Sequence, residues 1–190
     1  MSAQATNRRE QSEWEPVTTA QFCQGMRNLA GACVVITGSD AGQRAGLTAT
    51  AVCSISADPP RLLVCVNRNV YAHRLISNSG VLCINALQVD QEHIARRFAG
   101  MVEGVAGEER FAAGAWDEGA NGLPTLADAL VAFECRVVET IAASSHDMFI
   151  AEVIGVTGTL SQEDPLIYFN GKFSALAQVP GIALNHSQEQ

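Results

Sequence analysis

A chain of 190 residues suffices for one domain, and 47% hydrophobic against 17% charged residues supplies a core, which excludes a disordered chain. The net charge of −8, with no run of Lys and Arg, disfavours a protein that binds nucleic acid or an anionic membrane. The sequence contains no run of about 18 apolar residues and no apolar signal segment, so we expect a cytoplasmic protein.

We expect three sections along the chain. Residues 1–16 are polar and lack hydrophobic periodicity, which is typical of a flexible tail. Residues 17–178 form one domain, and residues 179–190 form a C-terminal tail. Within the domain, residues 18–29 predict a first helix, with one of the two threonines at its start as the N-cap.

Short runs rich in β-branched and small apolar residues follow, separated by turn signals such as GSDAGQ, DPP and SNSG. The runs are ACVVIT, AGLTATAVCSIS, RLLVCVN, VLCINAL, VAFECRVV and MFIAEVIGV, and the last two alternate apolar with polar side chains. Only VYAHRLISNS and DQEHIARRFAG predict further helices. Because the strands mostly follow one another directly, the pattern predicts a mainly β fold. We expect an antiparallel Greek-key barrel with a few peripheral helices, and residues 99–124 packed over it.

The run over residues 47–56 is the most informative one. On a single strand, its hydroxyl side chains would share one face, and they are Thr48, Thr50, Ser54 and Ser56. Such a row lets a flat, polar-edged ligand such as a flavin lie against the backbone. A solvated strand face gives the same pattern, and the residues alone leave both interpretations open. The following Asp58-Pro59-Pro60 predicts a sharp turn.

Two other features carry possible chemistry. Arg96 and Arg97 lie near the end of a predicted helix, where they could hold a phosphate or simply face solvent beside the negative end of the helix dipole. His146 lies between two predicted strands in the segment SSHD, from which it could hydrogen-bond a ligand. A Ser–His–Asp hydrolase is excluded, because residues adjacent in sequence cannot form the relay and no G-x-S-x-G elbow is present.

The glycines and cysteines exclude other classes. Gly38, Gly42 and Gly46 do not follow the G-x-G-x-x-G spacing of dinucleotide-binding loops, and no G-x4-G-K-[ST] loop occurs. The six cysteines contain no C-x-x-C pair and lie mostly in apolar runs. We therefore expect buried thiols rather than disulfides, and no metal site.

Taken together, these segments resemble the short-chain flavin reductases of two-component flavin-dependent monooxygenases. The run AGLTATAVCSISADPPRLLVCVN resembles the flavin strand and Asp-Pro-Pro turn of that family. Further matches occur in order over roughly residues 25–176, and they are VLCINAL, IARRFAG, EERF…W, SSHDMFIAEV and PLIYFNGKF. Among the branches of that family, the sequence most resembles the 4-hydroxyphenylacetate 3-monooxygenase reductase component, and the chlorophenol and pyrimidine-ring monooxygenase reductases are close alternatives.

The resemblance implies a split β-barrel homodimer that transfers a hydride from NADH, or NADPH, to FMN or FAD and supplies reduced flavin to a separate monooxygenase. It implies that His146 lies on the nicotinamide side. The flavin-binding positions that it implies are Thr48, Ala49, Thr50 and Ala51 at the ring; Ser54, Ser56 and Asp58 further along; Asn85 and Leu87 beside it; Arg96 and Arg97 at the phosphates; and Tyr168 and Phe173 closing the pocket. Two alternatives are an FMN-binding storage or electron-transfer protein that does not turn over, and an oxidase of the pyridoxamine-phosphate type.

Overall fold

The computed structural model describes residues 15–119, 122–158 and 163–177. The expected C-terminal tail at residues 179–190, and all but the last two residues of the expected N-terminal tail, lie outside this part. In the described residues, no helix combines the length and apolar character that a membrane span requires.

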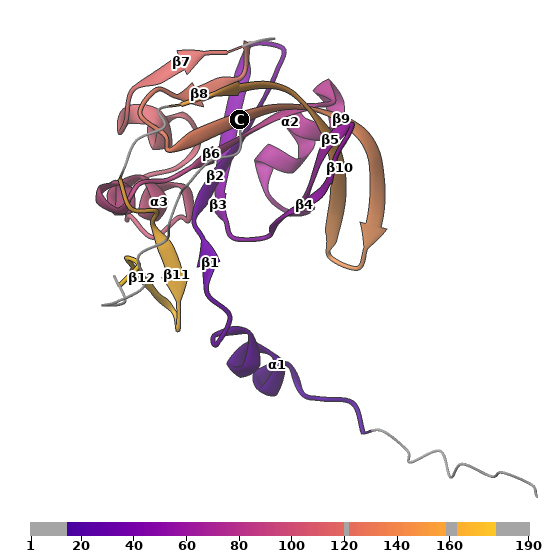
Figure 1. Ribbon diagram of the computed structural model, residues 1–190, viewed down its shortest axis with the longest axis vertical. Coiled ribbons are helices and arrows are strands. Elements are labelled where there is room, and N and C mark those ends of the chain that lie inside the picture. Colours follow the sequence, from indigo (N-terminus) through magenta and orange to yellow (C-terminus); the bar gives the residue numbers. More distant parts are fainter. Residues whose placement is uncertain (1–14, 120–121, 159–162, 178–190) are drawn as a thin grey trace, which may run out of the picture.

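A seven-stranded antiparallel sheet in the order β3-β2-β6-β9-β10-β5-β4 forms the body of the molecule (Figure 1). Its strands are β2 (Val34–Asp40), β3 (Gln43–Ala49), β4 (Val52–Ala57), β5 (Pro60–Asn67), β6 (Val81–Ala86), β9 (Val131–Ala143) and β10 (His146–Thr157). The sheet curls strongly, and α2 (Tyr71–Ser79) lies in its hollow (Figure 1). The predicted fold class, mainly β and antiparallel with few helices, is confirmed.

Smaller elements decorate this barrel-like sheet. β1 (Gly31–Ala32), β11 (Ile167–Phe169) and β12 (Lys172–Ser174) form a three-stranded sheet, and β7 (Trp116–Glu118) pairs with β8 (Pro124–Leu126). The remaining helical segments are α1 (Thr19–Met26), α3 (Glu92–Phe98) and the 3-10 turns η1 (Val89–Gln91) and η2 (Gly107–Ala112).

Local sequence explains where the helices begin and end. Thr18 caps α1 as predicted, and it exchanges capping-box hydrogen bonds with Gln21. α2 ends at Gly80, whose φ of 70° places it in the left-handed region that glycine tolerates best. The third predicted helix begins later than expected, at Glu92 rather than at Asp90, because the preceding residues form the 3-10 turn η1.

The sheet carries a hydrophobic cluster on each face. Inside the curl, Ile76 of α2 packs against residues such as Ile36, Leu82 and Phe149. On the outer face, α3, η2 and the β7–β8 hairpin cover the second cluster, whose buried members include Phe98, Phe111, Leu123 and Leu126. The described residues of the segment 99–124, which are 99–119 and 122–124, therefore pack on the barrel, as predicted.

One expectation about individual side chains is wrong. The cysteines are not uniformly buried, since Cys23 and Cys53 are exposed and Cys65 is half-buried. Glu134 lies on the face of β9 opposite Cys135, as the alternation requires, and it is only 5% exposed because the outer elements cover that face.

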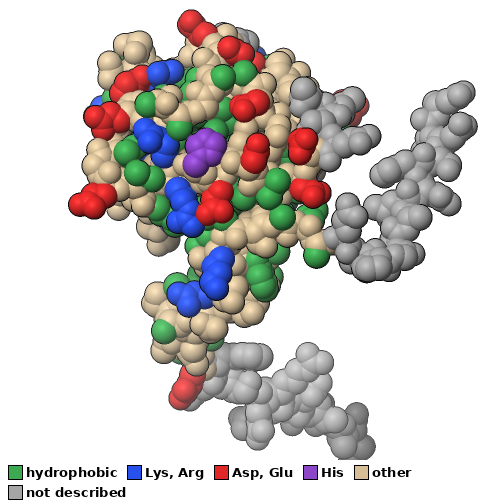
Figure 2. Space-filling model, turned by 90° about the vertical axis from the view of Figure 1, so that its left-hand side faces the viewer, with side chains coloured by type: hydrophobic (Ala, Val, Ile, Leu, Met, Phe, Trp, Pro, Cys, Tyr) green, Lys and Arg blue, Asp and Glu red, His purple; other side chains and the backbone are tan. Residues whose placement is uncertain are grey.

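Charges are mixed on the surface. On the face shown in Figure 2, the described Lys and Arg side chains alternate with Asp and Glu. The described part of this face therefore carries no extended basic patch of the kind that binds nucleic acid.

Candidate active site

The run over residues 47–56 is two strands rather than the single strand expected. It divides at Thr50 and Ala51, and its halves, β3 and β4, lie at opposite ends of the strand order. Hydrogen bonds from Val52 N to the Thr50 carbonyl (3.1 Å) and from Cys65 N to the Ala51 carbonyl (3.2 Å) fix this corner. We refer to Thr50 and Ala51 below as the β3–β4 corner.

The backbone at this corner offers two donors. Within the described part of the chain, the N–H groups of Thr50 and Ala51 donate to no hydrogen-bond acceptor. Thr50 and Ala51 are exposed, so these two adjacent N–H groups are free to donate to water or to a ligand. The acceptor-rich edge of a flavin ring suits such a pair.

Two clefts meet at the corner. One, of about 210 Å³, extends along the end of β3, and its lining is Cys33, Thr48, Ala49, Thr50, Ala99, Met101, Tyr168 and Phe173. The other, of about 450 Å³, extends along α1, with Thr50, Ala51 and Tyr168 among its lining residues. Thr50 and Tyr168 belong to both clefts, so the two are continuous. Taken together, their volume falls within the range of small-molecule sites, roughly 300–1,000 Å³.

Aromatic side chains from the last strands close one side of the smaller cleft. Tyr168 of β11 and Phe173 of β12 contact each other edge to face, with ring centroids 5.3 Å apart. The guanidinium of Arg96 lies over the Phe173 ring at 5.2 Å and is also paired with Glu92 at 2.6 Å. The predicted residues at the ring and pocket closure therefore come together, and Arg96 reaches the rim of the cleft.

A glycine allows β1 to pass close to the corner. A Cβ atom added at Gly31 would lie 2.9 Å from the Cβ of Thr50, closer than side chains tolerate. β1 carries β11 through antiparallel pairing between Gly31 and Tyr168. Because Gly31 has no side chain, β1 can lie close to Thr50, and the aromatic wall formed by Tyr168 and Phe173 lies beside it.

The hydroxyl groups of the predicted row are not equivalent. Thr48 donates its hydroxyl to the Ala95 carbonyl at 2.7 Å, which fastens β3 to α3. Ser56 donates to the Pro59 carbonyl at 2.5 Å within the β4–β5 turn, where Asp58 precedes a cis proline. Thr50 and Ser54 are exposed. A ligand at the corner therefore meets the Thr50 hydroxyl directly and Thr48 mainly as a packing surface.

Other predicted flavin-binding residues lie away from the clefts. Asn85 is fully buried, accepts a hydrogen bond from Leu126 N at 2.8 Å and donates to the Val35 carbonyl at 3.0 Å. Leu87 is 1% exposed and belongs to the outer hydrophobic cluster. Arg97 donates to the carbonyls of residues 109 and 110, at 2.6 and 3.3 Å, and lines neither cleft. All three side chains therefore contact other parts of the protein and do not line the clefts.

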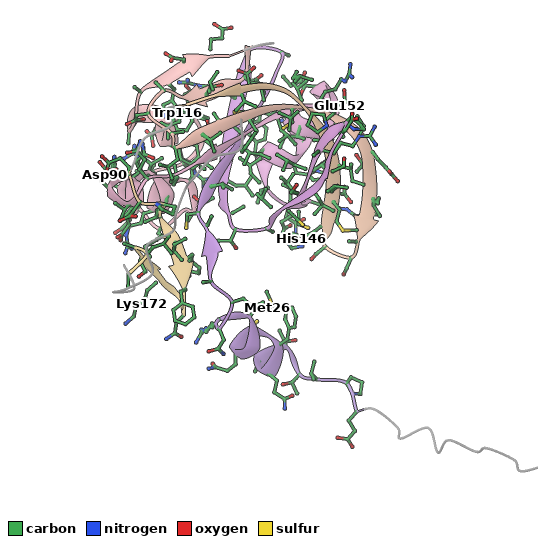
Figure 3. The ribbon with its side chains drawn as sticks, viewed as in Figure 1. Met26, Asp90, Trp116, His146, Glu152 and Lys172 are labelled. Atoms are coloured by element: carbon green, nitrogen blue, oxygen red, sulfur yellow. The ribbon has the colours of Figure 1, made fainter. Side chains whose placement is uncertain are left out.

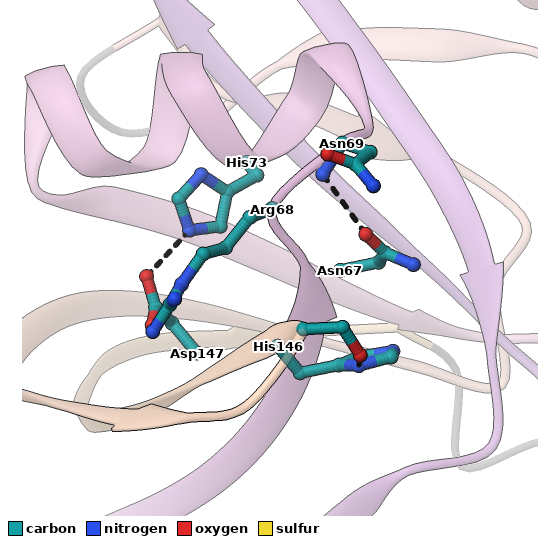
Figure 4. A network of polar contacts seen from close by, with 7 residues as sticks. Asn67, Arg68, Asn69, His73, His146 and Asp147 are labelled. Atoms are coloured by element: carbon teal, nitrogen blue, oxygen red, sulfur yellow. Dashed lines mark hydrogen bonds and ion pairs between the residues drawn. The ribbon is translucent and has the colours of Figure 1, made fainter.

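His146 is the first residue of β10 and lies at the same end of the barrel as the β3–β4 corner (Figure 3). Ala51 meets Cys65, which pairs with Met148, two residues along β10 from His146. The path from Ala51 to His146 crosses two strand spacings, from β4 to β5 and from β5 to β10, and then runs two residues along β10. The Cα atoms of Ala51 and His146 are therefore about 10–12 Å apart. Ser145 Oγ lies 2.9 Å from His146 Nδ1 (Figure 4), while Nε2 has no partner among the described residues.

The sequence patterns missed several residues that line the clefts. From α1 and the loop after it come Phe22, Met26 and Arg27, and from the end of α3 come Ala99 and Met101. Arg27 adds a second positive side chain at the site besides Arg96. An amphipathic helix near the N-terminus was visible in the sequence, but nothing there showed that it lies beside residues 50–51.

Cys33 is the one cysteine in the wall of the smaller cleft. Burial raises the pKa of its thiol to about 11, so only about one thiol in a thousand ionises at pH 8. We predict that iodoacetamide at pH 8 leaves Cys33 unmodified in the native protein and labels it in urea, as peptide mass spectrometry would show. Equal labelling rates in both states would contradict a neutral, protected thiol.

Comparison with known proteins agrees with this geometry. Residues 26–177 match the model of the flavin reductase like domain. An FMN reductase (NADH) RutF from Ancylobacter novellus is 39% identical over 86% of this chain and 88% of its own. The solved flavin reductase PheA2 superposes with a TM-score of 0.76 at 31% identity, over 85% of this chain and 100% of that one. BorF, the flavin reductase component of a bacterial two-component tryptophan halogenase, gives 0.76 at 26% identity, over 85% and 100%.

Proposed function

The chain belongs to the family of flavin reductase like domains, and from this premise we propose that it reduces FMN with NADH and supplies the reduced flavin to a separate monooxygenase component. The relatives named above support FMN and NADH as the pair, and FAD is the alternative flavin. The observation that carries the proposal is the β3–β4 corner. There, two free backbone N–H groups, a threonine hydroxyl and an aromatic wall meet in continuous clefts.

The protein's part in the reaction is to bind and orient. A bound flavin supplies the redox chemistry by accepting the hydride that NADH donates. The N–H groups of Thr50 and Ala51 hold the polar edge of the ring, where negative charge develops during reduction. Tyr168 and Phe173 exclude water from one side of the ring.

Charged and imidazole groups complete the site. Arg96 and Arg27 are the positive side chains at the clefts and are our candidates for the flavin phosphate. The resemblance also implies Arg97, Ser54, Ser56 and Asp58 along the ribityl phosphate. His146, with Nε2 available, orients the nicotinamide carboxamide, and positioning at near-attack distance suffices for hydride transfer.

The decisive test is NADH oxidation followed at 340 nm on flavin-free protein with added FMN or FAD. We expect a rate that saturates with added flavin, because a reductase of this kind treats flavin as an exchanging substrate. Stoichiometric retention of flavin with no NADH or NADPH oxidation would instead establish the carrier that does not turn over.

We also propose that the protein is a homodimer, because α1 has no buried residue of its own. Phe22, Met26 and Leu29 are 58%, 47% and 64% exposed, and the helix stands away from the barrel (Figure 1). An eight-residue helix is not stable alone in water, so another surface must cover this apolar face. A second copy of the chain fits, since α1 also lines the larger cleft and its covering would complete the site.

Sedimentation analysis checks the dimer. We predict a mass of twice 20.1 kDa for the parent. Joint replacement Phe22→Asp and Met26→Asp should weaken association at least about 100-fold, because two buried apolar side chains are lost in each copy. Gln24→Asp, on the same helix, is the matched control and should leave the dimer intact. A monomeric parent would refute the proposal.

A cytoplasmic location is part of the proposal. All six cysteines are free thiols, which is typical of proteins in a reducing compartment.

A further inference from the structure

One carboxylate joins three elements beside His146. Asp147 Oδ1 accepts hydrogen bonds from Arg68, at 2.8 Å from Nε and 2.6 Å from Nη2. Its Oδ2 lies 2.8 Å from Nε2 of His73 on α2 (Figure 4). The hydrogen bond from Arg68, followed by that from His73, lowers the pKa of Asp147, so the carboxylate stays ionised at neutral pH. We call Arg68, His73 and Asp147 the Asp147 clamp.

The clamp acts on the backbone on both sides of His146. Arg68 N donates to the Ser145 carbonyl at 3.1 Å, so the turn after β5 holds the residue before His146. The Asp147 side chain holds the residue after it. Across the ladder, His146 pairs with Asn67, whose side chain in turn accepts from Asn69 N at 2.9 Å.

The two side chains point in opposite directions. Successive residues of a strand alternate between faces, so Asp147 points to the α2 side together with the buried Phe149. His73 also contacts the Phe149 ring, with centroids 5.4 Å apart, which fixes the imidazole against the inner core. The backbone of β10 at His146 is thereby anchored to the core, while the His146 ring faces away from it.

The turn before His146 needs this anchoring. Ser144 has a φ of 53°, in the left-handed region that serine rarely adopts, and Ser145 is exposed. The ladders to β5 and β9 hold the backbone at His146, and the clamp adds side-chain contacts from α2 and from the turn after β5. A displacement of about 1 Å at a reacting group can cost about 100-fold in rate.

We propose that Arg68, His73 and Asp147 are positioning residues that aim His146 at the nicotinamide. The inference rests on the proposed function, in which His146 contacts NADH. None of the three residues needs to touch a substrate for this role. It predicts a selective effect on NADH, whereas a purely structural role would lower stability and affect both substrates alike.

The test is Asp147→Asn, which keeps the size of the side chain and removes its charge. We expect kcat/KM for NADH to fall about 10- to 100-fold, while the KM for FMN stays within about twofold. Glu152→Gln is the matched control, since Glu152 is also on β10 and contacts two arginines, at 3.1 and 3.7 Å, but lies six residues from His146. It should leave both kinetic constants unchanged.

Two further variants make the outcome unambiguous. His73→Gln keeps an N–H donor for Asp147 and should retain more NADH activity than His73→Leu, which removes it. His146→Ala is measured in parallel. If His146→Ala impairs NADH use and Asp147→Asn does not, the clamp is refuted alone. If His146→Ala leaves NADH use normal, both the role assigned to His146 and the role proposed for the clamp are refuted. Flavin-dependent turnover by the parent would still support the reductase function.

Discussion

Thr50→Trp should abolish flavin use, with the apparent affinity for FMN falling at least about 100-fold. Thr50 is exposed and is the residue at the corner common to both clefts. An indole there would occupy the space over the free N–H groups of Thr50 and Ala51. A loss of this size corresponds to about 2.7 kcal/mol of binding free energy, which the loss of these contacts and steric exclusion can supply. Fluorescence titration with FMN measures it directly.

Two controls separate this effect from damage to the fold. Thr157→Trp adds the same side chain at another exposed position, the far end of β10 from His146, and should bind FMN normally. Thr50→Ser retains the hydroxyl and should bind within a few-fold of the parent. Both Trp variants should melt within a few degrees of the parent, because surface substitutions seldom change stability by more than about 0.5 kcal/mol. Normal FMN affinity in Thr50→Trp would place the ring elsewhere.

Alternation identifies a strand most clearly where only one face is buried, whereas central strands such as β2 and β6 bury both faces. Alternation in VAFECRVV and MFIAEVIGV identified β9 and β10, and Phe149 and Ala151 are buried as the pattern requires. Glu134 lies on the polar face of this pattern and is nevertheless buried. The sequence of a strand shows only on which face each side chain lies. Whether that face is buried depends on segments that come from elsewhere in the chain.

The division of the run over residues 47–56 could not be read from its residues. Thr50 and Ala51 are small and continue the alternation, so they suit a straight strand as well as a corner. The deciding factor is the curl of the whole sheet. β3 and β4 take places at opposite ends of the strand order, and the chain between them must turn. The corner that this creates is also where the clefts meet, so the missed feature is the one that forms the site.

The candidate site was predicted in part, and by resemblance more than by spacing. Thr50, Tyr168 and Phe173 do come together, although 118 residues or more separate Thr50 from the other two in the sequence. The sequence predicted neither the α1 residues that line the larger cleft nor the Asp147 clamp, because both depend on contacts between elements distant in sequence. Arg68 and His73 gave no local signal, since a polar side chain after a strand or on a helix is ordinarily solvated.

Asn85 is the residue for which resemblance and geometry make opposite predictions. The resemblance places it beside the flavin, whereas in the structure its amide joins β2 to β8 through Val35 and Leu126. Replacing it by alanine leaves the buried N–H of Leu126 without its acceptor and the Val35 carbonyl without this donor. Each unpaired buried group costs about 1–3 kcal/mol.

We therefore expect Asn85→Ala to lower the free energy of unfolding by about 2–6 kcal/mol, and the melting temperature by roughly 4–24 °C. FMN affinity measured well below the transition should change by no more than a few-fold. Thr37→Val is the matched control, because Thr37 donates to the Pro124 carbonyl of the same strand β8 at 2.6 Å, and leaving this one buried carbonyl without its donor should cost about 1–3 kcal/mol. If Asn85→Ala instead keeps its melting temperature and loses FMN about 100-fold, Asn85 contacts the flavin, and β8 must move to expose it.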